Sequence, residues 1–514
     1  MFESRWQGMS RRGFIEASAL AGVGAGLGSL GVVGRALAQD GVTPTPLDGK
    51  AVRFRPEIEP VVRWLEETPR ERILERVVAK LRGGWSYRDL MAGVFLAGIR
   101  NIQPRPVGFK FHAVMVVHAA HQLGMSATVD EWLIPMLWAV DTFKASQERD
   151  VREGDWTLGP ANEQRLPRAS DSREAFRKAM DAWDPEAADA AAIALARSHS
   201  AAAVMEAFWP YAIRDQRNIG HKAIFAAQAF RTLQTIGWQH AEPVLRSLAY
   251  GLLDRQGKPG VDVVGPWEQN QQAAGRFSED WMQGVPDIAA SDGLMSELRG
   301  ASPAAAGASL LEYVQGGIAP AGIWDGILKA ANELLLRKPG IVSLHSVTSV
   351  NALHTIFLSA ADDATRRLSL LQAASWVALF RDALGEARAL NLQQLEPLET
   401  PADPREALAD IFATIGASRD DAARKTLGFL SRGGDAEAVF AAARRQIFVK
   451  ANDSHDFKFG ATAWEEALLA STPATQARLV AGMMGHLPAS TAPDSPLMAQ
   501  ARAAAAAAGA STPR

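Results

Sequence analysis

One plan repeats four times along the chain, and this repeat limits the possible folds more than any other feature. In each copy an apolar stretch with helical spacing ends near a basic residue, and a short loop follows. The next helical stretch then begins at or near a histidine. The four histidines are His112, His221, His345 and His455. A period of about 110 residues is too long for one short helical repeat and suits a unit of about four helices.

The residues between the loops favour helices throughout. Apolar side chains recur three and four positions apart, as at Ala92, Phe95, Leu96 and Ile99. After each histidine helix the pattern predicts a returning helix, over 130–144, 241–254, 363–380 and 474–484. Stretches such as 173–198 supply a variable fourth helix. The sequence therefore predicts an all-α protein whose about four units stack into an α/α solenoid or close into an α/α toroid around a concave site.

The N-terminal segment has the pattern of a twin-arginine signal peptide. Arg11 and Arg12 precede a Gly- and Ala-rich apolar stretch, which closes with Ala36-Leu37-Ala38. The stretch is only weakly apolar, so no stable membrane anchor is expected. We predict residues 1–38 to be a signal peptide, the twin-arginine translocase to be a partner during export, and the mature protein to be periplasmic.

The remaining chain is predicted to be one all-α repeat domain over residues 39–486 and an Ala-rich flexible tail over 487–514. The formal net charge of the whole chain is −3, which gives no reason to expect nucleic acid or anionic lipid as a partner. The chain contains no cysteine. Disulfides, iron–sulfur clusters and thiolate metal ligands are therefore excluded, and a metal has to be held by His, Asp, Glu or backbone oxygen.

The four repeat histidines are the predicted metal ligands. If the units are related by rotation about one axis, then the four imidazoles converge on that axis. Imidazole suits iron, zinc, copper or manganese, and a pair of histidines can also hold haem. Four histidines fill a tetrahedral site, whereas three with an open position form a catalytic one. The structural alternative is that each histidine caps its helix, a device that repeats also preserve.

Further site residues follow from the same register. His118 lies on the helix of His112, and Asn351 stands at the matching offset after His345; both are predicted to take part in catalysis. Basic residues stand in the loops before the four histidines, where they are predicted to bind an anionic substrate or a carboxylate-bearing cofactor. These are Arg105, Arg217, Arg337 and Lys450. Near a helix C-terminus, such residues also favour the helix dipole.

Two segments carry a family resemblance. Leu344-His-Ser-Val-Thr-Ser-Val-Asn-Ala-Leu353, and Gly220-His221 with the Ala-rich helix after it, resemble the questin oxidase-like family. The resemblance covers short stretches within residues 87–486. It implies a helical fold and an oxygen-using oxidation of an aromatic or ketone substrate, with His221 and His345 near the site. It also brings an association with NADPH, for which no dinucleotide-binding fold is visible in the mature chain.

Together these observations predict an exported metal-dependent enzyme, an oxidoreductase acting on a small molecule at a His-lined site. Two alternatives remain open at this point. One is a non-catalytic helical-repeat protein whose groove binds a partner or a hydrophobic ligand. The other is a haem-binding protein, which requires two opposed histidines with a flat cavity between them.

Overall fold

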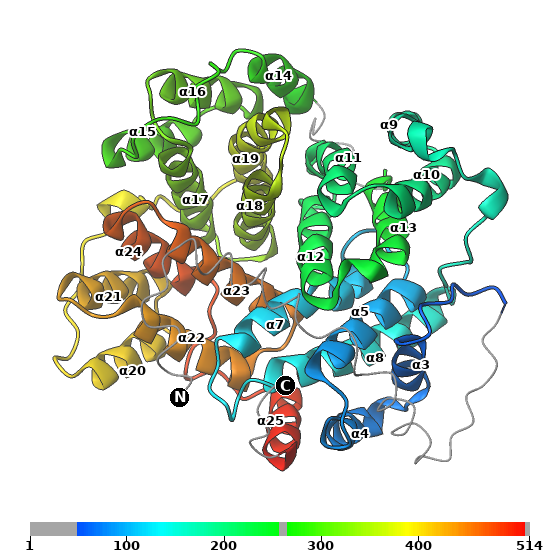
Figure 1. Cartoon of the computed structure of the whole chain (residues 1–514). Coiled ribbons are helices and arrows are strands. Elements are labelled where there is room, and N and C mark those ends of the chain that lie inside the picture. The colour runs from blue at the N-terminus through cyan, green and yellow to red at the C-terminus, as the bar shows by residue number, and fades with distance from the viewer. Residues whose placement is uncertain (1–48, 256–264, 509–514) are drawn as a thin grey trace. The chain divides into compact units, whose positions relative to one another are not determined.

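The computed structural model describes residues 49–255 and 265–508, and these form an all-α protein. Within those ranges the backbone makes no β-strand; one isolated bridge pairs Val285 with Ile318. The predicted fold class is confirmed (Figure 1). The predicted signal peptide lies outside the described residues.

Two compact units share the helices. Of the described residues, the first comprises 49–204, 228–254 and 500–508, and the second comprises 205–227, 255 and 265–499. The first contains α3 (Glu59–Glu67), α4 (Arg70–Arg82), α5 (Tyr87–Asn101), α6 (His112–Met115), α7 (Val117–Met125), α8 (Ile134–Glu153), α9 (Ser172–Ala182), α10 (Pro185–Ser198) and α13 (Ala241–Leu252). The second contains α14 (Gly265–Ala274), α15 (Ile288–Leu298), α16 (Pro303–Gln315), α17 (Pro320–Arg337), α18 (Ile341–Ser359), α19 (Asp363–Leu384), α20 (Pro404–Thr414), α21 (Arg419–Ser431), α22 (Ala436–Lys450), α23 (Ser454–Leu469) and α24 (Pro473–Gly482). The boundary crosses α11 (Ala201–Ile213), α12 (His221–Ile236) and α25 (Pro496–Ala508).

Local sequence explains where many of these helices begin. Asp184 accepts hydrogen bonds from the backbone N–H groups of Glu186 and Ala187 at the start of α10, and Asp403 does the same for α20. An acidic or hydroxyl side chain at this position satisfies N–H groups that the first helical turn leaves unpaired. Proline follows directly after both caps, where its missing N–H costs nothing.

In the first unit, α5 is buried along almost its whole length and packs against α3 and α8. Its last turn carries Arg100, only 1% exposed, which forms ion pairs of 2.7 Å with Glu59 and with Glu66. A buried guanidinium is tolerated because two carboxylates compensate its charge.

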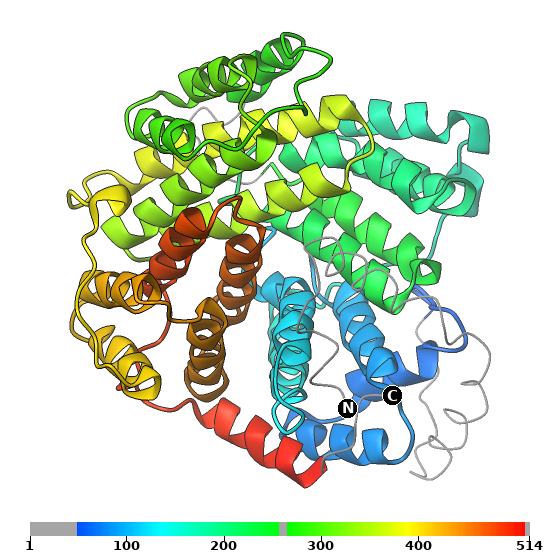
Figure 2. The same cartoon turned by 60° about the vertical axis from the view of Figure 1, so that its left-hand side comes forward.

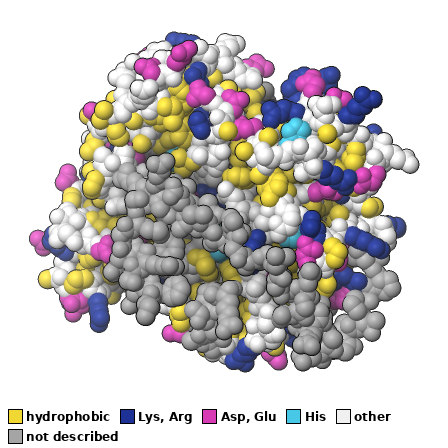
Figure 3. Space-filling model, in the orientation of Figure 1, with side chains coloured by type: hydrophobic (Ala, Val, Ile, Leu, Met, Phe, Trp, Pro, Cys, Tyr) yellow, Lys and Arg dark blue, Asp and Glu magenta, His cyan; other side chains and the backbone are white. Residues whose placement is uncertain are grey.

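In the second unit, α18 forms the centre and packs against α17, α19 and α23. Both views show α18 and α19 lying side by side (Figures 1 and 2). By length and composition α18 could cross a membrane, but 83% of that stretch is buried inside the protein. Its apolar character therefore fits the core helix of this unit. On the face drawn in Figure 3, Lys and Arg side chains of the described residues are interspersed with Asp and Glu.

The predicted helices of the repeat are confirmed. In each of the four copies one helix precedes the loop (α5, α11, α17 and α22), a second carries the histidine (α6, α12, α18 and α23), and a third returns (α8, α13, α19 and α24). Stretch 173–198 forms two helices, α9 and α10. The predicted repeat domain over residues 39–486 stays a prediction, and so does the solenoid or toroid.

The segment predicted to be an Ala-rich flexible tail includes a helix. Residues 496–508 form α25, in which Met498 and Ala501 have no exposed surface. The hydroxyl of Ser495 accepts a hydrogen bond from the N–H of Met498, and alanine has the highest helix propensity of all residues. The cap, the alanines and the buried side chain of Met498 together favour this helix.

Candidate metal centre

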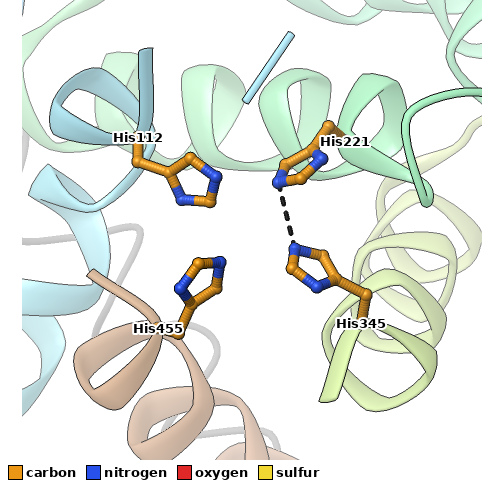
Figure 4. A group of neighbouring side chains, drawn as sticks. All are labelled: His112, His221, His345 and His455. Atoms are coloured by element: carbon orange, nitrogen blue, oxygen red, sulfur yellow. Dashed lines mark hydrogen bonds between the residues drawn. The ribbon is translucent and has the colours of Figure 1, made fainter. Parts of the chain in front are cut away.

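Three of the four repeat histidines lie together in the second unit. His221 is the first residue of α12, His345 lies in the first turns of α18, and His455 is the second residue of α23. The Nε2 atoms of His221 and His345 are 3.0 Å apart. The ring of His345 lies 4.5 Å from that of His221 and 5.0 Å from that of His455, measured between centroids. One nitrogen from each of the three lies within 4.8 Å of the others, so this trio could hold a metal ion (Figure 4).

The backbone before His221 is strained in a way that holds its ring. Asn218, Ile219 and Gly220 all have positive φ, at 55°, 51° and 81°. A β-branched residue such as Ile219 rarely adopts this conformation. The turn brings the carbonyl of Asn218 to 2.5 Å from Nδ1 of His221. Such strain often marks a functional site, because the surrounding structure has to maintain it.

The other two imidazoles are held in the same manner. Nδ1 of His345 lies 2.7 Å from the carbonyl oxygen of Ile341, one turn earlier in α18. Nδ1 of His455 lies 3.1 Å from a carboxylate oxygen of Asp453, the N-cap of α23. Because a carbonyl or carboxylate oxygen only accepts, each Nδ1 has to carry the proton and donate it. Metal-bound histidines are usually oriented by this kind of hydrogen bond.

With the protons on Nδ1, the Nε2 atoms of His221 and His345 both face each other as hydrogen-bond acceptors. A neutral imidazole with its proton on Nδ1 presents only a lone pair at Nε2. The two lone pairs therefore face each other across 3.0 Å, which repels unless a cation lies between them. A metal bound at about 2.0–2.1 Å by two such nitrogens in tetrahedral geometry would separate them by roughly 3.3 Å.

Protonation of one imidazole would also relieve this repulsion, but the surroundings of these histidines disfavour it. Burial lowers the pKa of His221 and of His345 well below the usual value, and the charge of Lys458 lowers both further. Burial also lowers the pKa of His455, although Asp453 opposes the shift. Three imidazoles that resist protonation keep their lone pairs available for a metal ion at neutral pH.

Sequence reasoning missed two residues that belong to this centre. Asp453 orients His455, and its position two residues before a helix-starting histidine was a readable signal. Lys458 lies one turn after His455 on α23, is 1% exposed, and burial lowers its pKa to about 7. Its place between the apolar residues Phe457 and Phe459 indicates an inward-facing helix segment, where lysine is unusual.

Three of the predicted site residues, His112, His118 and Arg105, belong to the first unit. His112 begins α6 and is one of the four histidines labelled in Figure 4. Because it belongs to the other unit, its role as a ligand stays a prediction. His118 lies on α7, where burial, the charge of Arg231 and the neighbouring His121 lower its pKa. Nε of Arg105 donates to the carbonyl of Tyr250 at 2.5 Å, and the guanidinium lies 3.7 Å from the centre of that residue's ring.

The remaining predicted residues of the second unit have other hydrogen-bond partners. Asn351 lies six residues after His345, roughly 9 Å along the helix axis. Its amide donates to Glu465 at 2.9 Å and to Glu466 at 2.8 Å. Lys450 pairs with Asp494 at 2.9 Å, and Arg337 donates to the carbonyl of Arg388 at 3.1 Å. Arg217 lies in the loop before His221, where its backbone N–H donates to the carboxylate of Asp215 at 3.1 Å.

Helices α18 and α23, which carry His345 and His455, are also joined by a second buried polar group. Nδ1 of His354, on α18, lies 2.7 Å from Glu466, on α23, and the ring of Trp324 stacks on His354 at 4.3 Å. With the amide of Asn351, this pair ties α18 to α23. The two helices that present His345 and His455 are thereby joined further along their length.

Comparison with protein-family models finds no match to this chain. Comparisons with curated proteins and with solved structures find none either.

Proposed function

We propose that the protein binds a transition metal ion through His221, His345 and His455. The observation that carries this proposal is the convergence of two Nε2 lone pairs at 3.0 Å from imidazoles whose Nδ1 protons are committed to backbone carbonyls. A cation removes the repulsion that this arrangement otherwise contains. The third histidine, oriented by a carboxylate, completes a donor set typical of protein metal sites.

The donor set limits the identity of the metal. Neutral imidazoles without thiolate suit iron, zinc, copper or manganese rather than calcium or magnesium. Three protein ligands leave a position for water or substrate, which is the arrangement of catalytic sites. We predict that His112 is a fourth ligand. With it the site would be closed in tetrahedral geometry, or would retain an open position with a metal of higher coordination number.

We propose oxidation of a small molecule as the reaction class. Iron, copper and manganese are redox-active, and the short segments around His221 and His345 resemble the questin oxidase-like family. That resemblance favours an oxygen-using oxidation of an aromatic or ketone substrate. Haem fits less well than a single ion, since two axial nitrogens need about 4 Å between them, and those of His221 and His345 are 3.0 Å apart.

We also propose that the protein acts in the periplasm after export by the twin-arginine route. The support is the sequence pattern around Arg11 and Arg12. A metal site enclosed by a folded core gives a physical reason for this route. A metal that binds only the native state stabilises it by mass action and can be inserted before transport.

Elemental analysis of the untagged full-length protein, together with its visible spectrum, tests the metal site. We expect about one equivalent of iron, copper, manganese or zinc in a folded sample, and loss of that metal in His221→Ala and His345→Ala. A His112→Ala variant tests the fourth ligand. A well-folded protein with no metal, which also fails to take up added zinc, would refute the proposed function.

A further inference from the structure

The trio leaves the charge of a bound metal almost uncompensated. Its three ligands are neutral imidazoles, and Asp453 is the carboxylate that the structure shows hydrogen-bonded to one of them. That carboxylate contacts His455 at Nδ1, so it contributes one negative charge behind the ligand. A divalent ion in a buried place is costly unless opposite charge lies close to it.

Nearby acidic groups of the second unit are committed elsewhere. Asp215 is buried and pairs with Lys222 at 3.0 Å. Asp456 accepts the backbone N–H groups of Asn452 and Asp453 at the start of α23. Neither carboxylate belongs to the set of side chains that could hold the metal. Among the described residues, the group that could hold the metal therefore consists of neutral imidazoles alone, and a ligand that carries negative charge would offset the charge of the metal.

Lys458 adds a donor on the same side of α23. It follows His455 by three residues, so both side chains project from one face of the helix. Its charge lowers the pKa of all three imidazoles of the trio. Whether its amine is charged or neutral, it donates hydrogen bonds. A metal with an amine beside it presents two groups that attract the same oxygen.

We propose that the trio's metal takes an anionic oxygen ligand, such as the carboxylate of a substrate or product, and that Lys458 donates a hydrogen bond to that oxygen. This inference rests on the proposed metal site and adds to it the chemical class of the molecule that it binds. The ligand supplies the missing negative charge, and Lys458 distinguishes it from a neutral oxygen donor.

Titration of the cobalt(II)-loaded full-length protein with acetate tests the inference, since cobalt reports changes of its ligands in the visible spectrum. Acetamide, which has nearly the same shape without the charge, is the control ligand. We expect acetate to change the spectrum with saturation and acetamide to have little effect. In Lys458→Met we expect cobalt binding to persist and acetate affinity to fall about tenfold or more, because a charge-assisted hydrogen bond is lost.

Lys80→Met is the matched control variant, because Lys80 is also a buried lysine but belongs to the first unit. It should leave acetate affinity unchanged. Equal acetate affinity in Lys458→Met and the unmutated protein would overturn the inference while leaving the metal site intact. Equal affinity for acetate and acetamide would overturn it as well. Failure of the unmutated protein to bind cobalt would refute the metal site itself, and the inference with it.

Discussion

Among the described residues, each of the two units contains a buried group of histidines, and the group of the second unit could hold a metal ion. In the second unit, three imidazoles from three helices converge, each with Nδ1 held by an oxygen acceptor. In the first unit, His118 and His121 lie three residues apart on α7 with their rings 5.8 Å apart. There, Nδ1 of His121 lies 3.2 Å from the hydroxyl of Tyr87, on which its ring also stacks.

Lowered pKa values do not distinguish the two groups. Burial lowers the pKa of His121 to about 4 and that of His118 well below its usual value, as it does for His221 and His345. What differs is the position of the Nε2 lone pairs and the neighbouring charge. A buried histidine becomes a candidate ligand when a fixed tautomer aims its second nitrogen at another such nitrogen.

The largest expected effect is on metal content. The double variant His221→Ala/His345→Ala should lose the bound metal completely, because it removes two of three converging nitrogens. The matched double variant His118→Ala/His121→Ala should retain about one equivalent. Elemental analysis of both folded proteins makes the comparison, and metal loss from the second variant would show that the first unit's pair is also part of a metal site.

The sequence predicted the elements of this site better than its details. The repeat register places His221, His345 and His455 at the starts of their helices, because the spacing of apolar residues and loop residues is readable from the chain. The hydrogen bond from His221 depends on three successive residues of positive φ, at 218–220. Asparagine and glycine adopt this conformation more readily than other residues, but no sequence rule predicts it for the β-branched Ile219.

The functions predicted for Asn351 and Lys450 rested only on their positions relative to the repeat histidines. Such positions do not determine which side chains these residues hydrogen-bond to. Asn351 follows His345 at a plausible offset, but its amide donates to Glu465 and Glu466. Those two glutamates lie more than a hundred residues away in the chain. Lys450 likewise pairs with Asp494, in the segment before α25. Such long-range partners appear only once the helices are packed.

The second-largest expected effect is the release of the metal at acidic pH. Protons compete for the lone pairs of the trio, but the pKa values of His221 and His345 in the folded protein are well below 6.5, so metal retention should fall only once the pH is well below 6.5. Stability of the metal-free protein should already fall from about pH 6.5 downward, because the unfolded chain takes up protons there. A histidine whose folded-state pKa is lowered binds its proton mainly in the unfolded state below pH 6.5, so each one costs up to about 1.4 kcal/mol per pH unit. Equilibrium denaturation between pH 8 and pH 5 measures this slope.

The variant His121→Phe separates the two groups in that experiment. It should reduce the pH dependence of unfolding, because one buried histidine no longer takes up a proton in the unfolded state. The pH of metal release should stay the same, since this residue is not among the proposed ligands. A shift of metal release in His121→Phe would contradict the assignment of the metal to the trio.

A smaller effect is expected from the carboxylate behind His455. Asp453→Ala should weaken metal binding by about 10- to 100-fold, because the imidazole loses the group that orients it. The same change removes the N-cap of α23, so a cap variant elsewhere is needed as control. Asp403→Ala removes the cap of α20 and should lower stability by about 1 kcal/mol without changing metal affinity. Equal metal affinity of the two variants, measured by competition with a chelator, would exclude the orienting role.

The smallest effect on metal binding is expected from the backbone that positions His221. Gly220 and Gly433 have similar φ values, 81° and 85°, but a Cβ on Gly220 would lie 2.5 Å from Cβ of Ser349, whereas one on Gly433 meets open space. Gly433→Ala should cost about 1–2 kcal/mol through its conformation alone, and Gly220→Ala about 1–3 kcal/mol more through overpacking.

The two glycine variants also separate strain from function. Only Gly220→Ala should lower metal affinity, by about tenfold or less, because relief of the clash moves the turn that holds Nδ1 of His221. Chelator competition on the folded variants measures it, beside denaturant unfolding for the stability difference. If Gly220→Ala destabilises the protein but binds metal as tightly as Gly433→Ala, then the left-handed turn at residues 218–220 serves packing alone, and the orientation of His221 has to be maintained by α12 itself.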